Sequence, residues 1–256
     1  MNLKEKLERH YLAFDKNRIS PDPLEFLHRF ESEPDIEAAG LISAVFAYGN
    51  VKQIINTLER IFVLTEGRPY NFITNLSSYD ERRLMELKHR FYTGMDIVVF
   101  FRILKYIYTK YGSVRNYFIQ FYDAAEPNLK NDINSFSVSL IEYAGENTKV
   151  TNGVKFMFPL PSLGSACKRM NLFLRWMVRK DELDFGLWKE IPASKLVIPV
   201  DTHVARICRE LKLTSLKNVS WKMADEITDN LRKFDPQDPV KYDFAICHIG
   251  MRKLKF

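Results

Sequence analysis

Apolar residues recur at helical spacing along most of this chain, and that pattern limits its fold more than any other feature. Between residues 51 and 62 the apolar side chains recur every three or four positions, at Val51, Ile54, Ile55, Leu58, Ile61 and Phe62. This spacing places them on one face of a helix. No long stretch alternates apolar and polar residues with period two, and no fixed-period repeat is present. The chain is therefore predicted to be all-α.

The same periodicity predicts helices elsewhere, over residues 2–15, 24–30, 36–47, 80–91, 95–108, 114–121, 131–143, 221–234 and 240–251. The polar residues 145–153 predict a connecting loop. A length of 256 residues is enough for one large domain or two packed lobes. We expect a two-lobed helical bundle. Residues 36–180 form its central lobe, which ends in a hairpin between two helices, and residues 1–35 with 181–256 form the second lobe.

The composition favours a cytoplasmic protein without a cofactor. The longest purely apolar run, Ile97 to Phe101, is far shorter than the roughly 18 residues of a membrane-spanning helix. The first residues lack the apolar core of a signal peptide. Cys167, Cys208 and Cys247 lie far apart without Cys-x-x-Cys spacing, which disfavours a disulfide framework, a zinc site or an iron–sulfur cluster. We expect a monomer that contacts no membrane and binds no metal.

The stretch from Pro159 to Arg206 combines a turn, a lysine and an aspartate. Leu160-Pro161-Ser162-Leu163-Gly164 predicts a turn that opens a helix near residue 165, with Lys168 close to its first turn. Val197–Val200 is predicted to be extended, because Pro199 biases the residue before it away from helix. Asp201 then occupies the N-cap position of the next helix. A lysine and an aspartate brought together form a plausible nucleophile and its partner, whereas capping alone is the alternative role for Asp201.

Positive charge is concentrated in the same stretch. The net charge of +6 and the sequence pI of about 9.1 favour a polyanionic partner. Residues 159–180 contain no acidic residue and five basic ones: Lys168, Arg169, Arg175, Arg179 and Lys180. In a helix from residue 165, Lys168, Arg175 and Arg179 lie opposite the apolar face. This basic face is either solvated, as on most amphipathic helices, or lines a cleft that holds phosphates.

These residues resemble the helix-hairpin-helix base-excision DNA glycosylases, the superfamily of endonuclease III and the 8-oxoguanine glycosylases. Leu160-Pro161-Ser162-Leu163-Gly164 is similar to the hairpin of that family, and Lys168 followed by Asn171 is similar to its catalytic-lysine motif. Val200-Asp201-Thr202-His203 is similar to the segment that supplies the catalytic aspartate. The stretch looks most like a bacterial branch of unknown function, the DUF2400-like proteins. Weaker likeness extends over residues 36–62 and 242–252.

The chain departs from the glycosylase pattern in several places. Lys168 lies four residues after Gly164, two more than in endonuclease III, and Ser162 replaces the first hairpin glycine. The iron–sulfur cluster of endonuclease III is absent. Lys168 and Asp201 are 33 positions apart, which is closer to the archaeal 8-oxoguanine branch. The resemblance therefore implies an oxidised purine as the first candidate lesion.

The resemblance implies a DNA glycosylase with AP-lyase activity on damaged or abasic double-stranded DNA, and association with the nucleoid when bound. Lys168 would attack the deoxyribose C1′, and Asp201 would stabilise the positive charge that develops there. The implied DNA contacts are Leu163, Gly164, Ser165, Arg169, Arg175, Arg179 and His203, together with Gly49 and Asn50, where relatives insert a loop into the duplex. The candidate walls of a base pocket are Tyr48, Trp176, Phe185 and Trp188, for each of which a core position is the alternative.

Two other classes of function stay open on the sequence. A non-catalytic helix-hairpin-helix module would bind DNA or RNA through the phosphate backbone, and would need the basic face but neither Lys168 nor Asp201. A Schiff-base enzyme for a small carbonyl substrate would need both residues and would have no affinity for nucleic acid.

Overall fold

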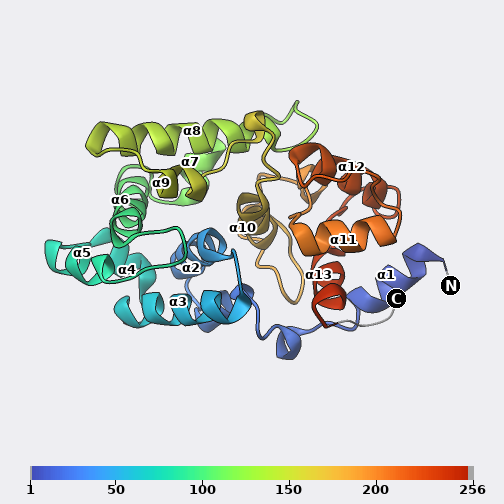
Figure 1. The fold of residues 1–256 in the computed structure, drawn as a ribbon, viewed down its shortest axis with the longest axis horizontal. Helices are drawn as coiled ribbons and strands as arrows, with labels where there is room; N and C mark the ends of the chain where they lie inside the picture. The colour runs from blue at the N-terminus through green and yellow to red at the C-terminus, as the bar shows by residue number, and fades with distance from the viewer. Residues whose placement is uncertain (1, 253–256) are drawn as a thin grey trace. The chain divides into compact units, whose positions relative to one another are not determined.

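The computed structural model describes residues 2–252, and within them the chain folds into helices joined by loops (Figure 1). The described residues contain no β-strand, only two isolated bridges, His89 with Tyr92 and Lys180 with Phe185. The prediction of an all-α fold is therefore confirmed. Among the described residues, no helix has both the length and the apolar character required to cross a membrane.

The chain divides into two compact units. Unit 1 comprises the chain up to Ile19, the segment Ala124–Asn131 and the chain from Leu160 onward. Unit 2 comprises Ser20–Asp123 and Asp132–Pro159. Unit 1 contains α1 (Leu3–Tyr11), η1 (Lys16–Arg18), η3 (Pro161–Leu163), α10 (Lys168–Val178), η4 (Ala193–Lys195), α11 (Thr202–Glu210), α12 (Trp221–Arg232) and α13 (Asp243–Arg252). Unit 2 contains η2 (Pro23–Arg29), α2 (Glu33–Phe46), α3 (Val51–Leu64), α4 (Pro69–Thr74), α5 (Ser78–Met85), α6 (Gly94–Tyr111), α7 (Val114–Ile119) and α9 (Asn152–Met157), with most of α8 (Lys130–Asn147).

This division differs from the expected lobes, because residues 160–180 group with the C-terminal part of the chain. The backbone amide of Trp221, at the start of α12, donates to the carbonyl of Gly164 at 3.0 Å. The side chains of Arg175, on α10, and Arg179, directly after it, form ion pairs with aspartates that follow α10. These contacts join the hairpin and α10 to α12 and α13. A turn sequence marks where a helix starts but carries no information on which later helix it will contact.

In unit 2 the central helix α2 is buried along most of its length, as its run of Ala, Gly, Leu and Ile residues predicts. A charged residue within it, Glu37, is 5% exposed. Its carboxylate accepts the backbone amides of Val114 at 2.8 Å and Arg115 at 2.9 Å, where α7 begins. The buried carboxylate of Glu37 therefore accepts hydrogen bonds from backbone amides at the start of α7. These amides have no partner within their own helix and would be costly to bury without one.

Helix ends were the least accurate part of the sequence prediction. The helix expected over 80–91 ends at Met85, and His89 and Tyr92 instead close a tight turn through two backbone hydrogen bonds of 3.1 and 2.8 Å. Two short helices, α4 and α9, were not predicted; each has only six residues, too few to show a helical period. The loop expected over 145–153 is shorter, because α8 continues to Asn147.

Candidate active site

The predicted hairpin is a tight turn whose tip is exposed. Pro161 begins the 3₁₀ turn η3, which the Gly164 amide closes by donating to the Pro161 carbonyl at 2.9 Å. Gly164 has φ +84°, a left-handed conformation that glycine adopts at little cost. Leu163 is 81% exposed, and its neighbours Ser162 and Gly164 are exposed as well. The hairpin therefore presents the Leu163 side chain to solvent, while the carbonyl of Gly164 is bonded to the start of α12.

Helix α10 begins at Lys168 itself, three residues later than predicted. The delay comes from Cys167, whose φ of +46° is left-handed and interrupts a helical path. The segment before it is held by side-chain bonds, from the Asn171 amide to the Ala166 carbonyl at 3.0 Å and from the Cys167 backbone to Ser165 Oγ at 3.2 Å. Lys168 is thus the first helical residue, where backbone amide hydrogens point out of the helix.

Asp201 caps α11 as predicted. The extended, buried residues 197–200 lead to Asp201, whose Oδ1 accepts the backbone amides of His203 at 2.8 Å and Val204 at 2.9 Å. The other carboxylate oxygen, Oδ2, lies 2.9 Å from Lys168 Nζ. The two residues that the sequence pattern singled out, 33 positions apart, are therefore in direct contact.

The Lys168–Asp201 pair is half-buried. The side chains are 30% and 29% exposed, so solvent and a ligand can reach them while much of their surface is shielded. Burial, the largest influence, raises the pKa of Asp201, but the Lys168 ammonium and the amides of Val204 and His203 outweigh it and hold that pKa below the ordinary value. Asp201 is therefore a carboxylate at neutral pH. The negative charge of Asp201 offsets the unfavourable position of the Lys168 ammonium at the N-terminus of α10, where the helix dipole is positive.

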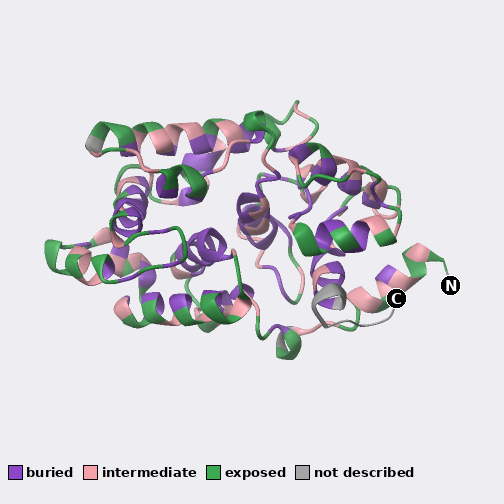
Figure 2. Cartoon of the chain, viewed as in Figure 1, coloured by how far each residue is buried: buried purple, intermediate pink, exposed green. Residues whose placement is uncertain are grey.

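The basic face predicted for α10 does not exist, and this corrects the placement of three DNA contacts. Arg169, Arg175 and Arg179 are 6%, 3% and 4% exposed, and Figure 2 shows α10 buried over most of its length. Only Lys168 and Leu172 in this helix are half-buried rather than buried. These three arginines are therefore unavailable to a phosphate backbone.

The two later arginines are held by carboxylates instead. Arg175 pairs with Asp184 at 3.2 Å and, more closely, with Asp243 of α13. Arg179 pairs with Asp181 and Asp238, each at 2.9 Å, and closely with Asp184. Together these six residues form the Arg–Asp cluster of unit 1: Arg175, Arg179, Asp181, Asp184, Asp238 and Asp243.

Burial dominates the electrostatics of this cluster. It raises the pKa of Asp184 above the ordinary value although both arginines act in the opposite direction. It also raises the pKa of Asp243 to about 6, against the effect of Arg175 and a smaller lowering by Lys168. Because Lys168 affects the pKa of Asp243, the Arg–Asp cluster and the candidate site are close enough to interact electrostatically.

Two of the four residues proposed to wall a base pocket are core residues. Trp176 and Trp188 are 0% and 1% exposed, and Trp188 packs edge-on against Phe173 with ring centroids 5.3 Å apart. Both are therefore excluded as pocket walls, and the alternative core assignment is correct for them. Phe185 is half-buried, and its backbone amide donates to the Trp176 carbonyl at 2.9 Å. His203 is exposed on α11, one turn from Asp201.

The remaining predicted residues, Tyr48, Gly49 and Asn50, lie in unit 2. Tyr48 belongs to a group of aromatic side chains, the Tyr48 cluster, with Phe91, Tyr92 and Phe156. Tyr48 is half-buried and contacts the Phe156 ring, with centroids 5.0 Å apart, while its hydroxyl donates to the His89 carbonyl at 2.7 Å. Gly49 and Asn50 are exposed, and Asn50 caps α3 by accepting the Lys52 amide at 2.9 Å.

Two exposed aromatic residues of this cluster were missed in the sequence. Phe91 is 66% exposed and nearly parallel to Tyr48, and Phe156 is 40% exposed. The guanidinium of Arg90 lies over the rings of Tyr48 and Phe91, 5.4 Å from each centroid. Phe91 was missed because it was assigned to the end of the helix predicted over residues 80–91. Phe156 was missed because it lies beyond the loop predicted over residues 145–153 and belonged to no predicted element.

These observations define an all-α protein with a half-exposed lysine–aspartate ion pair where two helices begin. A family model described as "Protein of unknown function (DUF2400)" matches residues 22–252, and the chain belongs to this family. Neither the curated proteins nor the solved structures gave a match to the chain.

Proposed function

We propose that this protein is a DNA glycosylase with AP-lyase activity, which removes a damaged base through a Schiff base on Lys168. The observation that carries the proposal is the 2.9 Å contact between Lys168 Nζ and Asp201 Oδ2, with Lys168 four residues after the last residue of a hairpin whose tip is exposed. A half-exposed amine beside an ionised carboxylate is the pair that nucleophilic attack on a sugar carbon requires. An oxidised purine such as 8-oxoguanine is the first substrate to test.

The chemistry assigns one role to each residue. The Lys168 ammonium gives up a proton, its nitrogen forms a bond to C1′, and the glycosidic bond breaks with its electron pair moving to the base, which takes up the proton. Asp201 receives and relays that proton, and its negative charge stabilises the cationic sugar that develops as the base departs. A second proton then moves from nitrogen to the ring oxygen as the sugar opens to the imine.

Binding of DNA is assigned to the exposed hairpin and to the Tyr48 cluster rather than to the buried arginines. The backbone amides of Leu163 and Gly164 already donate within the hairpin, to the carbonyls of Leu160 at 3.1 Å and Pro161 at 2.9 Å. The backbone amide of Ser165 is therefore the hairpin donor assigned to a phosphate, a contact that does not read sequence. His203 is a further exposed contact on α11. In unit 2, Gly49, Asn50 and Tyr48 are assigned to the bases, with the aromatic surface of Phe91 as a stacking partner.

The test is borohydride trapping on duplexes that carry an abasic site or 8-oxoguanine. We expect a covalent protein–DNA adduct with the wild type and none with Lys168→Ala or Lys168→Arg. Lys168→Arg is the sharper variant, because it keeps a cation beside Asp201 but cannot form an imine. Lys180→Ala, which removes an exposed lysine just after α10, is the matched control and should trap like the wild type. Absence of any adduct, or equal trapping by Lys168→Arg, refutes the proposal.

A non-catalytic nucleic-acid-binding role is the second candidate, because capping and pairing alone satisfy the carboxylate of Asp201. This role predicts salt-dependent binding of duplex DNA or RNA that survives Asp201→Asn and Lys168→Arg, with no release of a base. If the wild type is trapped, and these variants bind nucleic acid as well as the wild type but are not trapped, the result supports the enzyme. If the wild type binds nucleic acid but is not trapped, the result supports the non-catalytic binding module.

A further inference from the structure

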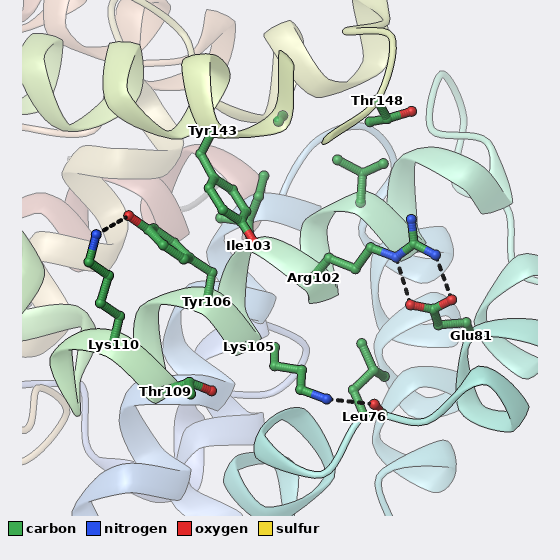
Figure 3. A pocket seen from close by; sticks show the side chains of 12 residues that line it. Leu76, Glu81, Arg102, Ile103, Lys105, Tyr106, Thr109, Lys110, Tyr143 and Thr148 are labelled. Carbon is green, nitrogen blue, oxygen red and sulfur yellow. Dashed lines mark hydrogen bonds and ion pairs between the residues drawn. The ribbon is translucent and has the colours of Figure 1, made fainter. Parts of the chain in front are cut away.

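We propose that unit 2 carries a separate ligand site, which binds a nucleoside monophosphate in a hollow between α5, α6 and the end of α8. The hollow has a volume of about 490 Å³ and is lined by residues of these helices together with Leu76 and Thr148 (Figure 3). This volume lies within the range of about 300–1,000 Å³ typical of small-molecule sites. All of its lining residues belong to unit 2, so this site is independent of the chemistry assigned to Lys168.

One side of the hollow is aromatic and apolar. Tyr143 of α8 and Tyr106 of α6 stack with centroids 3.8 Å apart and an interplanar angle of 17°. The aliphatic side chains of Leu76, Val99 and Ile103 complete this part of the lining. Stacked tyrosines beside aliphatic groups favour a flat aromatic ring, because such contacts gain both burial and ring–ring attraction.

The hollow also carries positive charge. Arg102, Lys105 and Lys110 line it with a single acidic residue, Glu81, which gives it an excess of two positive charges. Lys110 lies beside the tyrosines, where its ammonium donates to the Tyr106 hydroxyl at 3.2 Å, so Arg102 and Lys105 form the cationic wall (Figure 3). Glu81 engages Arg102 through Nε and Nη2, each at 2.6 Å, and the bond to Arg102 is the leading influence that lowers the Glu81 pKa. This bidentate contact fixes the plane of the guanidinium, and Nη1 points away from Glu81 (Figure 3).

Lys105 is anchored in a similar way. Its ammonium donates to the Leu76 carbonyl at 2.8 Å (Figure 3). A lysine ammonium has three donors, so two remain for a ligand. An oriented guanidinium and an anchored ammonium on one wall are the groups that bind a phosphate with charge-assisted hydrogen bonds.

A nucleoside monophosphate is the ligand class that uses both walls at once. A neutral aromatic compound does not compensate the two excess positive charges of the hollow, and inorganic phosphate makes no contact with the tyrosines and the aliphatic side chains. The hydroxyls of Thr109 and Thr148, which also line the hollow, are suited to the sugar. The base therefore lies against the tyrosine pair and the phosphate against Arg102 and Lys105.

Isothermal titration calorimetry with adenosine 5′-monophosphate tests this site in the full-length protein. We expect saturable binding that Arg102→Gln and Tyr143→Leu each weaken by about 10-fold or more. Arg83→Gln, which removes an arginine of α5 outside the hollow, is the matched control and should bind as the wild type does. Adenosine and inorganic phosphate should each bind at least about 10-fold more weakly than the nucleotide. Far-UV circular dichroism checks the fold of each variant, and Lys105→Met replaces Arg102→Gln should that variant unfold.

Several results overturn the inference. Absence of saturable binding at millimolar nucleotide removes the site, and equal binding by wild type, Arg102→Gln and Tyr143→Leu places it elsewhere. Phosphate binding as tightly as the nucleotide removes the aromatic part of the ligand class. Borohydride trapping is the independent readout of Lys168: nucleotide binding without trapping leaves this site standing while the proposed function fails, and trapping without binding does the reverse.

Discussion

Replacing Arg179 by methionine should destabilise unit 1 severely, because it leaves buried carboxylates without their partner. Methionine has a similar length and no charge, so packing is largely kept. Of the three aspartates that Arg179 contacts, Asp238 is 27% exposed and can regain water, whereas Asp184 is 1% exposed and cannot. Among the described residues, the one cation left beside the Asp184 carboxylate would be Arg175, at 3.2 Å. Loss of one partner of a buried ion pair costs about 3–5 kcal/mol, and we expect a loss in this range.

Tryptophan fluorescence during urea unfolding measures this effect in unit 1 alone, because the three tryptophans of the chain, Trp176, Trp188 and Trp221, all lie in that unit. Arg206→Met is the matched control: its ion pair with Glu210 is 50% and 57% exposed, so we expect a loss of about 0–1 kcal/mol. Adding Asp184→Asn to Arg179→Met should recover part of the stability, since it removes the unpaired buried charge. A loss as small as that of Arg206→Met, or no recovery in the double variant, would refute this account of the cluster.

The remaining predictions concern the site and unit 2. Asp201→Asn keeps a capping side chain but loses the ion pair, so we expect a loss of about 1 kcal/mol at pH 7 in the same fluorescence assay. Because the folded-state pKa of Asp201 lies below its ordinary value of 3.8, this difference should be full above that pH and should vanish as the pH falls through the folded pKa; a difference that persists in strong acid contradicts the ion-pair origin. Gly94→Ala places a Cβ 1.9 Å from the Met85 carbonyl oxygen and should cost about 1–3 kcal/mol by far-UV circular dichroism in urea. Gly145→Ala, whose Cβ would meet only a valine methyl at 3.3 Å, is its control, and equal losses would contradict the steric reason.

The parts of the structure that the sequence predicted correctly are those with a local cause. Helical periodicity identified α2, α3 and α6 because each helix buries at least one of its faces. A buried helix face needs apolar residues at regular helical spacing, and this spacing is visible in the sequence. The N-cap role of Asp201 follows from an aspartate between an extended run and a helix. The Lys168–Asp201 contact was predicted through a family resemblance, since no local rule brings together residues 33 positions apart.

The parts that failed depend on distant partners. On α10 the pattern distinguished apolar from basic positions, and a basic position is normally assigned to solvent. Arg175 and Arg179 are buried because carboxylates on later segments, Asp238 and Asp243, reach them. The spacing of residues along α10 cannot show that these carboxylates, which come from later segments of the chain, will lie beside it. A stretch without acidic residues therefore looked like a phosphate-binding face although its charges are neutralised from outside the stretch.

This neutralisation changes where a nucleic acid can be attracted. In the Arg–Asp cluster two arginines face four aspartates, and beside it Lys168 is balanced by Asp201. Three of the five cations in residues 159–180, Lys168, Arg175 and Arg179, are thus balanced by carboxylates close to the candidate site. The cluster instead ties α10 to α13, which holds Lys168, at the first position of α10, in a fixed place within unit 1. Arg175 and Arg179 are buried, so they act on the position of Lys168 rather than on the charge of a substrate. Under the proposed function, attraction of DNA therefore comes from exposed cations elsewhere on the chain.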